Sequence, residues 1–154
     1  MAKNEDIFSG VYNILNSAKS NTLSYVNNIL KGVRDFDIEI ENSLPAIILE
    51  PIRDTEIEAT LPNRKRVNFI INIFCIMKTY DYENQITGGA GTKNAKGILD
   101  MVSDVKNVLN ANRNLNGNVL KFRFTDTDYS FEDFPIRQAV ITMENDYILE
   151  DTGR

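Results

Sequence analysis

The amino-acid sequence predicts an α+β fold, a mostly antiparallel β-sheet with two α-helices packed on one face and one long hairpin. Two amphipathic helical stretches flank a series of strand-like segments, and further strand-like segments follow the second helix. Segregated helices and strands of this kind are typical of α+β proteins. We find no internal repeat and no linker, so residues 1–154 are expected to form a single domain.

The first helix is predicted over residues 4–31. Its apolar residues recur at three- and four-residue spacing, and they are Ile7, Val11, Ile14, Leu15 and Ala18. The polar stretch 20–22 weakens this pattern, so a break is expected there. A second helical stretch should then follow through Val26, Ile29 and Leu30, with Gly32 as its natural end.

Four strands are expected next, over residues 37–41, 46–49, 56–61 and 67–80. The first and third alternate polar and apolar residues, as antiparallel strands with one wet face do. Pro51 should end the second strand. The pair Pro62-Asn63 is a turn signal between the last two strands, which are therefore expected to form the long hairpin.

The second half begins with a polar loop over residues 81–97, which contains four glycines and is expected to be functional or flexible. A second helix follows, with a stripe formed by Ile98, Val102, Val105 and Leu109. Further strands are expected over residues 119–124 and 137–148. A loop with Asp126, Asp128 and Tyr129 should separate these strands, and residues 149–154 should form a loose tail.

The composition disfavours an enzyme, and no cofactor or metal site is expected. The chain has no histidine, the commonest general base and a frequent metal ligand. Its one cysteine, Cys75, lies in an apolar run and is expected to be a small buried hydrophobe. Residues 87–93 lack the Gly-Lys-Ser/Thr order of a phosphate-binding loop. A calcium loop that began at Asp126 would need glycine and glutamate where Phe131 and Arg137 stand.

The formal net charge is −5, and acidic residues cluster in segments 35–58, 126–133 and 144–151. Such a surface repels phosphates, so tight binding of nucleic acid is not expected. No apolar stretch is long enough for a membrane-spanning helix. The polar, acidic start of the chain is unlike a signal peptide, so the protein is expected in the cytoplasm where it is made.

The strand over residues 67–80 points to self-association. At about 3.3 Å per residue it would span roughly 46 Å, well beyond the ~17–20 Å of an ordinary strand. Its odd-numbered residues are all apolar from Val67 to Met77 and should lie under the helices. The even-numbered face also carries apolar side chains, which one helical layer would leave in water. We expect these side chains to form a subunit interface: Ile70, Phe74, Ile76 and Tyr80. A second internal layer over this face is the alternative.

Segments Leu44–Pro51, Gly97–Val105 and Ile141–Tyr147 occur in an order that also includes a long N-terminal helix and a long apolar strand ending in aromatic residues. In this order and pattern the chain resembles the tail-terminator, or tail-completion, proteins of long-tailed bacteriophages. The resemblance covers nearly all of residues 5–149. It rests on the arrangement of elements, because this family has no catalytic motif.

The resemblance implies a hexameric ring on the head-proximal end of the tail tube of a virion. Such a ring stops tube polymerisation and offers a surface for joining the head. Its partners would be further copies of the chain, the tail tube protein and the neck or connector proteins. DNA would pass through its acidic lumen without tight binding. The tube or neck contact would come from the hairpin tip and the glycine-containing loop, through Arg64, Lys65, Arg66, Gly88, Gly89, Gly91, Lys93 and Lys96.

Two other functions remain open at this point. A head–tail connector or other neck component belongs to the same broad class and has a similar pattern. A small ligand-binding domain belongs to a different class. The sequence Arg64-Lys65-Arg66 also fits an ordinary solvated hairpin tip, or a strand edge protected by charge.

Overall fold

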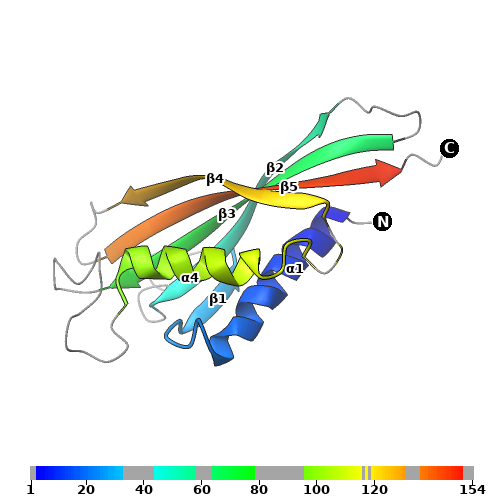
Figure 1. The fold of residues 1–154 in the computed structure, drawn as a ribbon. Helices are drawn as coiled ribbons and strands as arrows, with labels where there is room; N and C mark the ends of the chain where they lie inside the picture. The colour runs from blue at the N-terminus through cyan, green and yellow to red at the C-terminus, as the bar shows by residue number, and fades with distance from the viewer. Residues whose placement is uncertain are drawn as a thin grey trace.

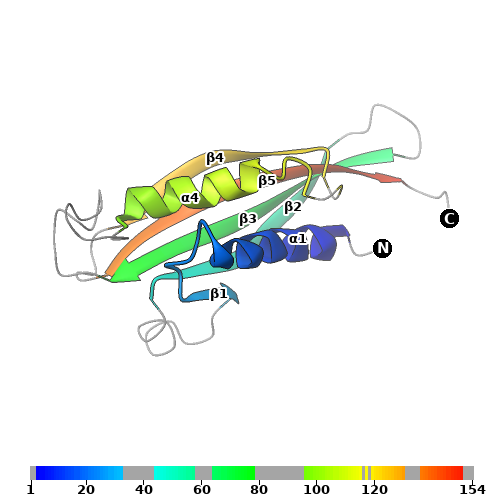
Figure 2. The same cartoon turned by 60° about the horizontal axis from the view of Figure 1, so that its bottom comes forward.

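The computed structural model describes residues 3–32, 44–57, 64–78, 96–115, 117, 119–130 and 136–150. Within them, five strands form one sheet in the order β1-β2-β3-β5-β4, and α1 and α4 lie on the same face of it (Figures 1 and 2). The elements are α1 (Lys3–Ser17), the 3-10 helix η1 (Ala18–Ser20), β1 (Asn28–Lys31), β2 (Ala46–Ile57), β3 (Arg64–Lys78), α4 (Ile98–Asn110), β4 (Lys121–Ser130) and β5 (Ile136–Glu150). The predicted α+β class is confirmed.

Strand β3 is the centre of the sheet. It pairs antiparallel with β5 along its whole length, from Arg64 opposite Glu150 to Lys78 opposite Ile136. On its other side it pairs antiparallel with β2, which confirms the predicted hairpin pairing. The odd-numbered apolar face of β3 lies in the main core as predicted, with every member at most 5% exposed: Val67, Phe69, Ile71, Ile73, Cys75 and Met77.

Helix α4 follows the predicted pattern closely. Its buried stripe consists of Ile98, Met101, Val102, Val105 and Leu109. Gly97, which was expected to close the preceding loop, is the N-cap residue. The carboxylate of Asp100 accepts a hydrogen bond of 3.0 Å from the Gly97 N–H. This contact satisfies one of the backbone donors that the first turn of a helix leaves unpaired.

The second helical stretch predicted through Val26, Ile29 and Leu30 is wrong. The chain does break near residue 20, through η1 and a turn, but it then forms strand β1, which pairs parallel with Ala46–Leu49 of β2. Val26 and Ile29 are both buried, but Val26 lies before the strand and only Ile29 lies in it. Pairing with the backbone of β2 decides in favour of the strand, because it satisfies main-chain groups along a buried sheet edge.

Pro51 does not end a strand: residues 46–49 and residues 56–57 belong to one strand, β2, and the rest of the strand predicted over 56–61 lies outside the described residues. Proline has no N–H to donate, so it is tolerated where one side of a strand is unpaired. Strand β1 pairs with β2 only as far as Leu49. The register with β3 shifts between Pro51 and Arg53, which marks a β-bulge.

The C-terminal strands are longer than predicted. Asp126, Asp128 and Tyr129 lie in β4 and not in a loop, because β4 continues past a register shift after Phe124. Leu149 and Glu150 pair with β3, so the loose tail predicted from residue 149 is wrong for these two. Several predictions lie outside the described residues: the strand over 37–41, the turn at Pro62-Asn63, Tyr80, and the loop 81–97 before Lys96.

The even-numbered face of β3 is not the exposed apolar surface that the sequence suggested. Ile76 is 0% exposed, Ile70 is 7% exposed, and Phe74 is half-buried. A second, smaller apolar cluster lies on this face, opposite the helices, and contains Ile48, Ile76, Leu30, Leu44, Phe74 and Ile136. Ile76 and Phe74 therefore belong to an apolar cluster on this face of the sheet.

None of the helices in the described part of the chain combines the length and the apolar character that crossing a membrane requires.

Replacing Ile76 by alanine should lower the free energy of unfolding by about 2–4 kcal/mol, because it opens a cavity at a fully buried site. The matched control is Ile52→Ala, at a residue that is 48% exposed, which should change this free energy by less than about 0.5 kcal/mol. Urea unfolding of both variants measures the difference. Equal stability of the two variants would show that Ile76 is not part of a core.

Candidate functional site: the projecting blade

The sheet narrows to three strands at one end. Strand β1 reaches only Leu49 of β2, and the pairing of β4 with β5 begins at Asp146. Beyond these points β2, β3 and β5 continue without neighbours among the described residues and extend past both helices (Figure 1). We call this end the blade and define it as Arg53–Ile57, Arg64–Asn68 and Asp146–Glu150. A projecting end of this kind is available for contact with another molecule.

Both faces of the blade are exposed near its tip. Residues 64–66 of β3, 53–56 of β2 and 148–149 of β5 are all exposed. Ile148 lies opposite Arg66 and is 43% exposed, whereas Leu149 lies opposite Lys65 on the other face and is 38% exposed. Each face therefore presents an aliphatic side chain beside a cation. Arginine and apolar side chains are common contributors to protein–protein contacts.

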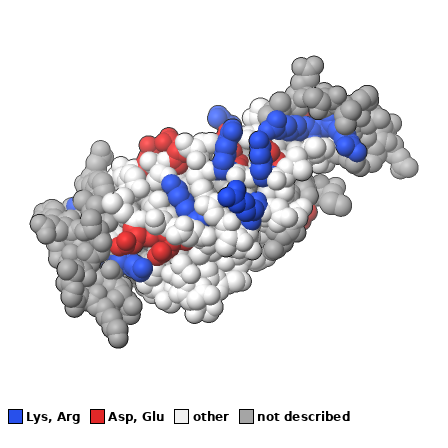
Figure 3. Space-filling model, viewed as in Figure 1, with Lys and Arg blue, Asp and Glu red and all other residues white. Residues whose placement is uncertain are grey.

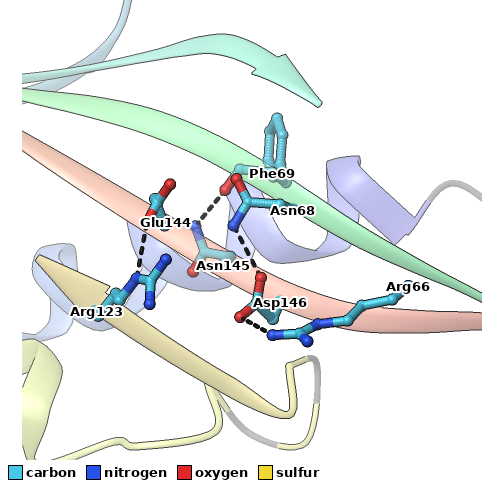
Figure 4. A network of polar contacts seen from close by, with 7 residues as sticks. All are labelled: Arg66, Asn68, Phe69, Arg123, Glu144, Asn145 and Asp146. Carbon is cyan, nitrogen blue, oxygen red and sulfur yellow. Dashed lines mark hydrogen bonds and ion pairs between the residues drawn. The ribbon is translucent and has the colours of Figure 1, made fainter. Parts of the chain in front are cut away.

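A polar network holds the root of the blade on the face opposite the helices (Figure 4). The carboxylate of Asp146 accepts a hydrogen bond of 2.8 Å from the Asn68 side chain and one of 3.1 Å from Arg66. Asp146 is only 4% exposed. Nearby, the Arg123 side chain donates to Glu144 at 2.7 Å, which ties β4 to β5.

Burial of Asp146 raises its pKa, but the hydrogen bonds from Asn68 and Arg66 outweigh that effect, and the pKa lies below its ordinary value. The carboxylate is therefore held ionised near neutral pH. Its bonds join β3 to β5 where the sheet narrows.

The helix face of the blade is tied to the start of α1. The Tyr147 hydroxyl donates a hydrogen bond of 2.7 Å to the Asn4 side-chain oxygen, and the Asn4 amide donates one of 2.7 Å to Asp54. Burial, together with the nearby charges of Asp54 and Glu56, raises the pKa of Tyr147, so its hydroxyl keeps the proton that it donates. Polar contacts thus fix the root of the blade on both faces.

The structure divides the predicted contact residues. Arg64, Lys65 and Arg66 lie together on the blade, where Lys65 forms an ion pair of 3.5 Å with Glu56. Lys96 lies before α4, at the opposite end of the molecule from the blade (Figure 1), and pairs with Asp104 at 3.6 Å. The other predicted contact residues lie outside the described part of the chain: Gly88, Gly89, Gly91 and Lys93.

The predicted interface residues are also separated from the blade tip. Ile76 and Phe74 belong to the second apolar cluster, and Ile70 is buried. The sequence patterns did not predict the polar network around Asp146. They also did not predict the hydrogen bonds that link Tyr147, Asn4 and Asp54. The sequence signal for the network around Asp146 is Asn68, which together with Asn72 interrupts the apolar run from Val67 to Met77.

The distribution of charge distinguishes the two ends of the helix face. In Figure 3, basic side chains gather on the middle of this face and towards the blade, whereas most of the visible acidic side chains lie towards the opposite end. The chain as a whole carries a net charge of −5. The basic region is therefore a local feature, suited to an acidic protein surface.

Two features of the described residues bear on their chemistry, the thiol of Cys75 and a groove beside α4. Burial raises the pKa of the Cys75 thiol to about 12, as expected for a buried hydrophobe, and thiols of this kind are inert. No group of three metal-ligating side chains occurs among these residues. A groove of about 340 Å³ lies between the end of α1 and α4. Its lining carries no charged residue: Ile14, Ser17, Ala18, Asn21, Thr22, Asn107, Val108, Ala111 and Asn112.

No protein-family model matches this chain, and no curated protein is similar to it in sequence. Among solved structures, it is similar to a chain in the virion of a native gene transfer agent particle. The TM-score is 0.44 and the sequence identity is 8%, over 88% of this chain and 90% of that chain.

Replacing Asp146 by asparagine should lower the free energy of unfolding at neutral pH by about 1–3 kcal/mol, since it weakens charge-assisted hydrogen bonds at a buried position. The pKa of Asp146 is lower in the folded protein than in the unfolded chain, where it is about 3.9. The ionised carboxylate therefore contributes fully to the stability of the fold above this pH, and the contribution is lost as the pH falls through the folded pKa.

The difference in free energy of unfolding between Asp146→Asn and the wild type should therefore shrink below about pH 4. The control Asp6→Asn, at an exposed position, should change the free energy of unfolding by less than about 0.5 kcal/mol. Urea unfolding across pH measures both variants. A difference between Asp146→Asn and wild type that stays constant down to about pH 2 would contradict this account.

Proposed function

We propose that this chain is a structural subunit of a phage-like virion and not an enzyme. It forms a ring on the head-proximal end of the tail tube, where it ends tube polymerisation and presents a surface for joining the head. The observation that supports the proposal best is the blade, a sheet end that projects beyond the helices and is exposed on both faces. The resemblance to tail-terminator proteins in the order of elements supplies the place in the virion.

A ring requires two different surfaces on each subunit that fit each other. A projecting element suits one of them, because it can reach onto the neighbouring copy. The blade offers aliphatic and cationic side chains on both faces, through Ile148 with Arg66 and Leu149 with Lys65. The contacts at its root keep it ordered before assembly, and this lowers the entropic cost of association.

The chemistry of the described residues also favours a structural role. Asp146, a buried carboxylate, is held ionised by its donors and is therefore a poor proton donor. The one thiol is buried in the core. These groups stabilise the fold and do not converge on a reaction centre.

The partners in this proposal are further copies of the chain, the tail tube protein and the neck proteins. Six copies around the ring are expected from the resemblance to tail terminators. The acidic balance of the chain, −5 overall, suits a lumen through which DNA slides without tight binding. A neck or head–tail connector component is the second candidate, because it too would use a projecting contact surface.

Electron microscopy of particles assembled without this chain separates the two candidates. Abnormally long tails would support a terminator, because tube growth would lack its stop. Tails of normal length that fail to attach to heads would support a neck component. Complete particles with normal attached tails would contradict both candidates.

Lys65→Glu should weaken association of the subunits by roughly tenfold, which corresponds to about 1.4 kcal/mol. The change reverses an exposed charge near the blade tip without removing a buried contact. The matched control is Arg113→Glu, which makes the same change of charge in the exposed turn after α4. Mass photometry over a dilution series, together with the amount of each variant incorporated into particles, measures the effect. Association and incorporation equal to those of the control would exclude the blade as a contact surface.

A further inference from the structure

Strand β4 is one edge of the sheet among the described residues, and no described element lies beyond it in either view (Figures 1 and 2). Its charged residues form two blocks of opposite sign. Lys121 and Arg123 occupy the first half, Asp126 and Asp128 occupy the second half, and all four are exposed. Edge strands often carry charge that prevents pairing with other chains. The order of positive and negative residues along the strand decides whether parallel or antiparallel pairing is prevented.

A β-bulge brings the two blocks onto one face. Arg123 lies opposite Glu144 of β5, whereas Asp126 lies opposite Thr142, so Thr125 is an extra residue on β4. Without it, residues 123 and 126 would point to opposite faces, because side chains alternate along a strand. With it, the charged residues occupy alternate positions along one continuous face.

This arrangement is self-complementary for an antiparallel copy. A twofold axis between Phe124 and Thr125 places Lys121 opposite Asp128 of the second copy, and Arg123 opposite Asp126. Opposite charges that face each other across antiparallel strands are stabilising, and like charges are destabilising. A parallel copy in register would instead meet like charges at every position. Arg123 already contacts Glu144 but is 63% exposed, and its guanidinium has five donors.

The same register matches exposed apolar side chains. Leu120, immediately before β4, is 62% exposed, and Tyr129, near its end, is 41% exposed. The twofold axis that pairs the charges places Leu120 of one copy opposite Tyr129 of the other, at both ends of the contact. Charge and apolar surface therefore select the same register independently.

We propose that β4 pairs antiparallel with β4 of a second copy of this chain, extending the sheet across two molecules. The contact is isologous and closes at two copies. It therefore goes beyond the proposed ring, which needs two different surfaces and uses the blade. The bulge at Thr125 sets the register, and the Lys121–Asp128 pair, formed twice, selects the antiparallel orientation.

Sedimentation of purified protein with Lys121→Glu, Asp128→Lys and the double swap tests this proposal. Each single variant places two like-charge pairs in the contact, so its dimer should dissociate about tenfold more readily than that of the wild type. The double swap should restore wild-type dimerisation, and so should an equimolar mixture of the two single variants. Circular dichroism of each variant shows that it is folded.

The outcomes separate this contact from the ring. A wild type that stays monomeric at about 1 mM would overturn the β4 pairing. Single variants that associate like the wild type, or a double swap that fails to restore dimers while folded, would overturn it as well. A wild type that forms only a larger assembly, with the same mass and concentration dependence in all three β4 variants but weakened in Lys65→Glu, would overturn the β4 pairing and leave the proposed ring intact.

Discussion

Pairing of β3 on both sides is the constraint on which the rest of the structure depends. All 15 of its residues have a partner in β5, and most also have one in β2. Its odd-numbered face closes the main core under the helices, and its even-numbered face takes part in the smaller cluster. Because β3 is longer than the helical layer, the same pairing carries the sheet out beyond it. The blade follows from an over-long central strand with two antiparallel neighbours.

The two proposed contact surfaces differ in what they can build. The blade projects from one end of the sheet, and a contact that joins this end to a different surface of the next copy can continue around a ring. The β4 edge is self-complementary, and such a contact stops at two molecules. Both surfaces combine exposed apolar side chains with paired charges, so association through either is expected to weaken as salt rises.

Sequence patterns correctly predicted the elements in which one whole face or stripe is buried in the core. Helix α4 and the helix face of β3 were predicted correctly because one stripe or one face is apolar throughout. Strand β1 was missed because the spacing of Val26, Ile29 and Leu30 is helical, and only pairing with the distant β2 selects the strand. Pro51 misled the prediction for β2 because its tolerance depends on where β1 ends. The hydrogen bonds at the root of the blade join Asn4, Asp54 and Tyr147. Because these residues are far apart in sequence, no local pattern could reveal the contacts.

We infer that copies of this chain assemble through the blade. Hydrogen–deuterium exchange of the wild-type chain, compared between its dilute monomer and its assembled state, tests it most directly. We expect assembly to slow exchange in the blade segments, Arg53–Ile57, Arg64–Asn68 and Asp146–Glu150, and to leave exchange in the buried stripe of α4 unchanged. Blade amides that exchange equally fast in both states would contradict it.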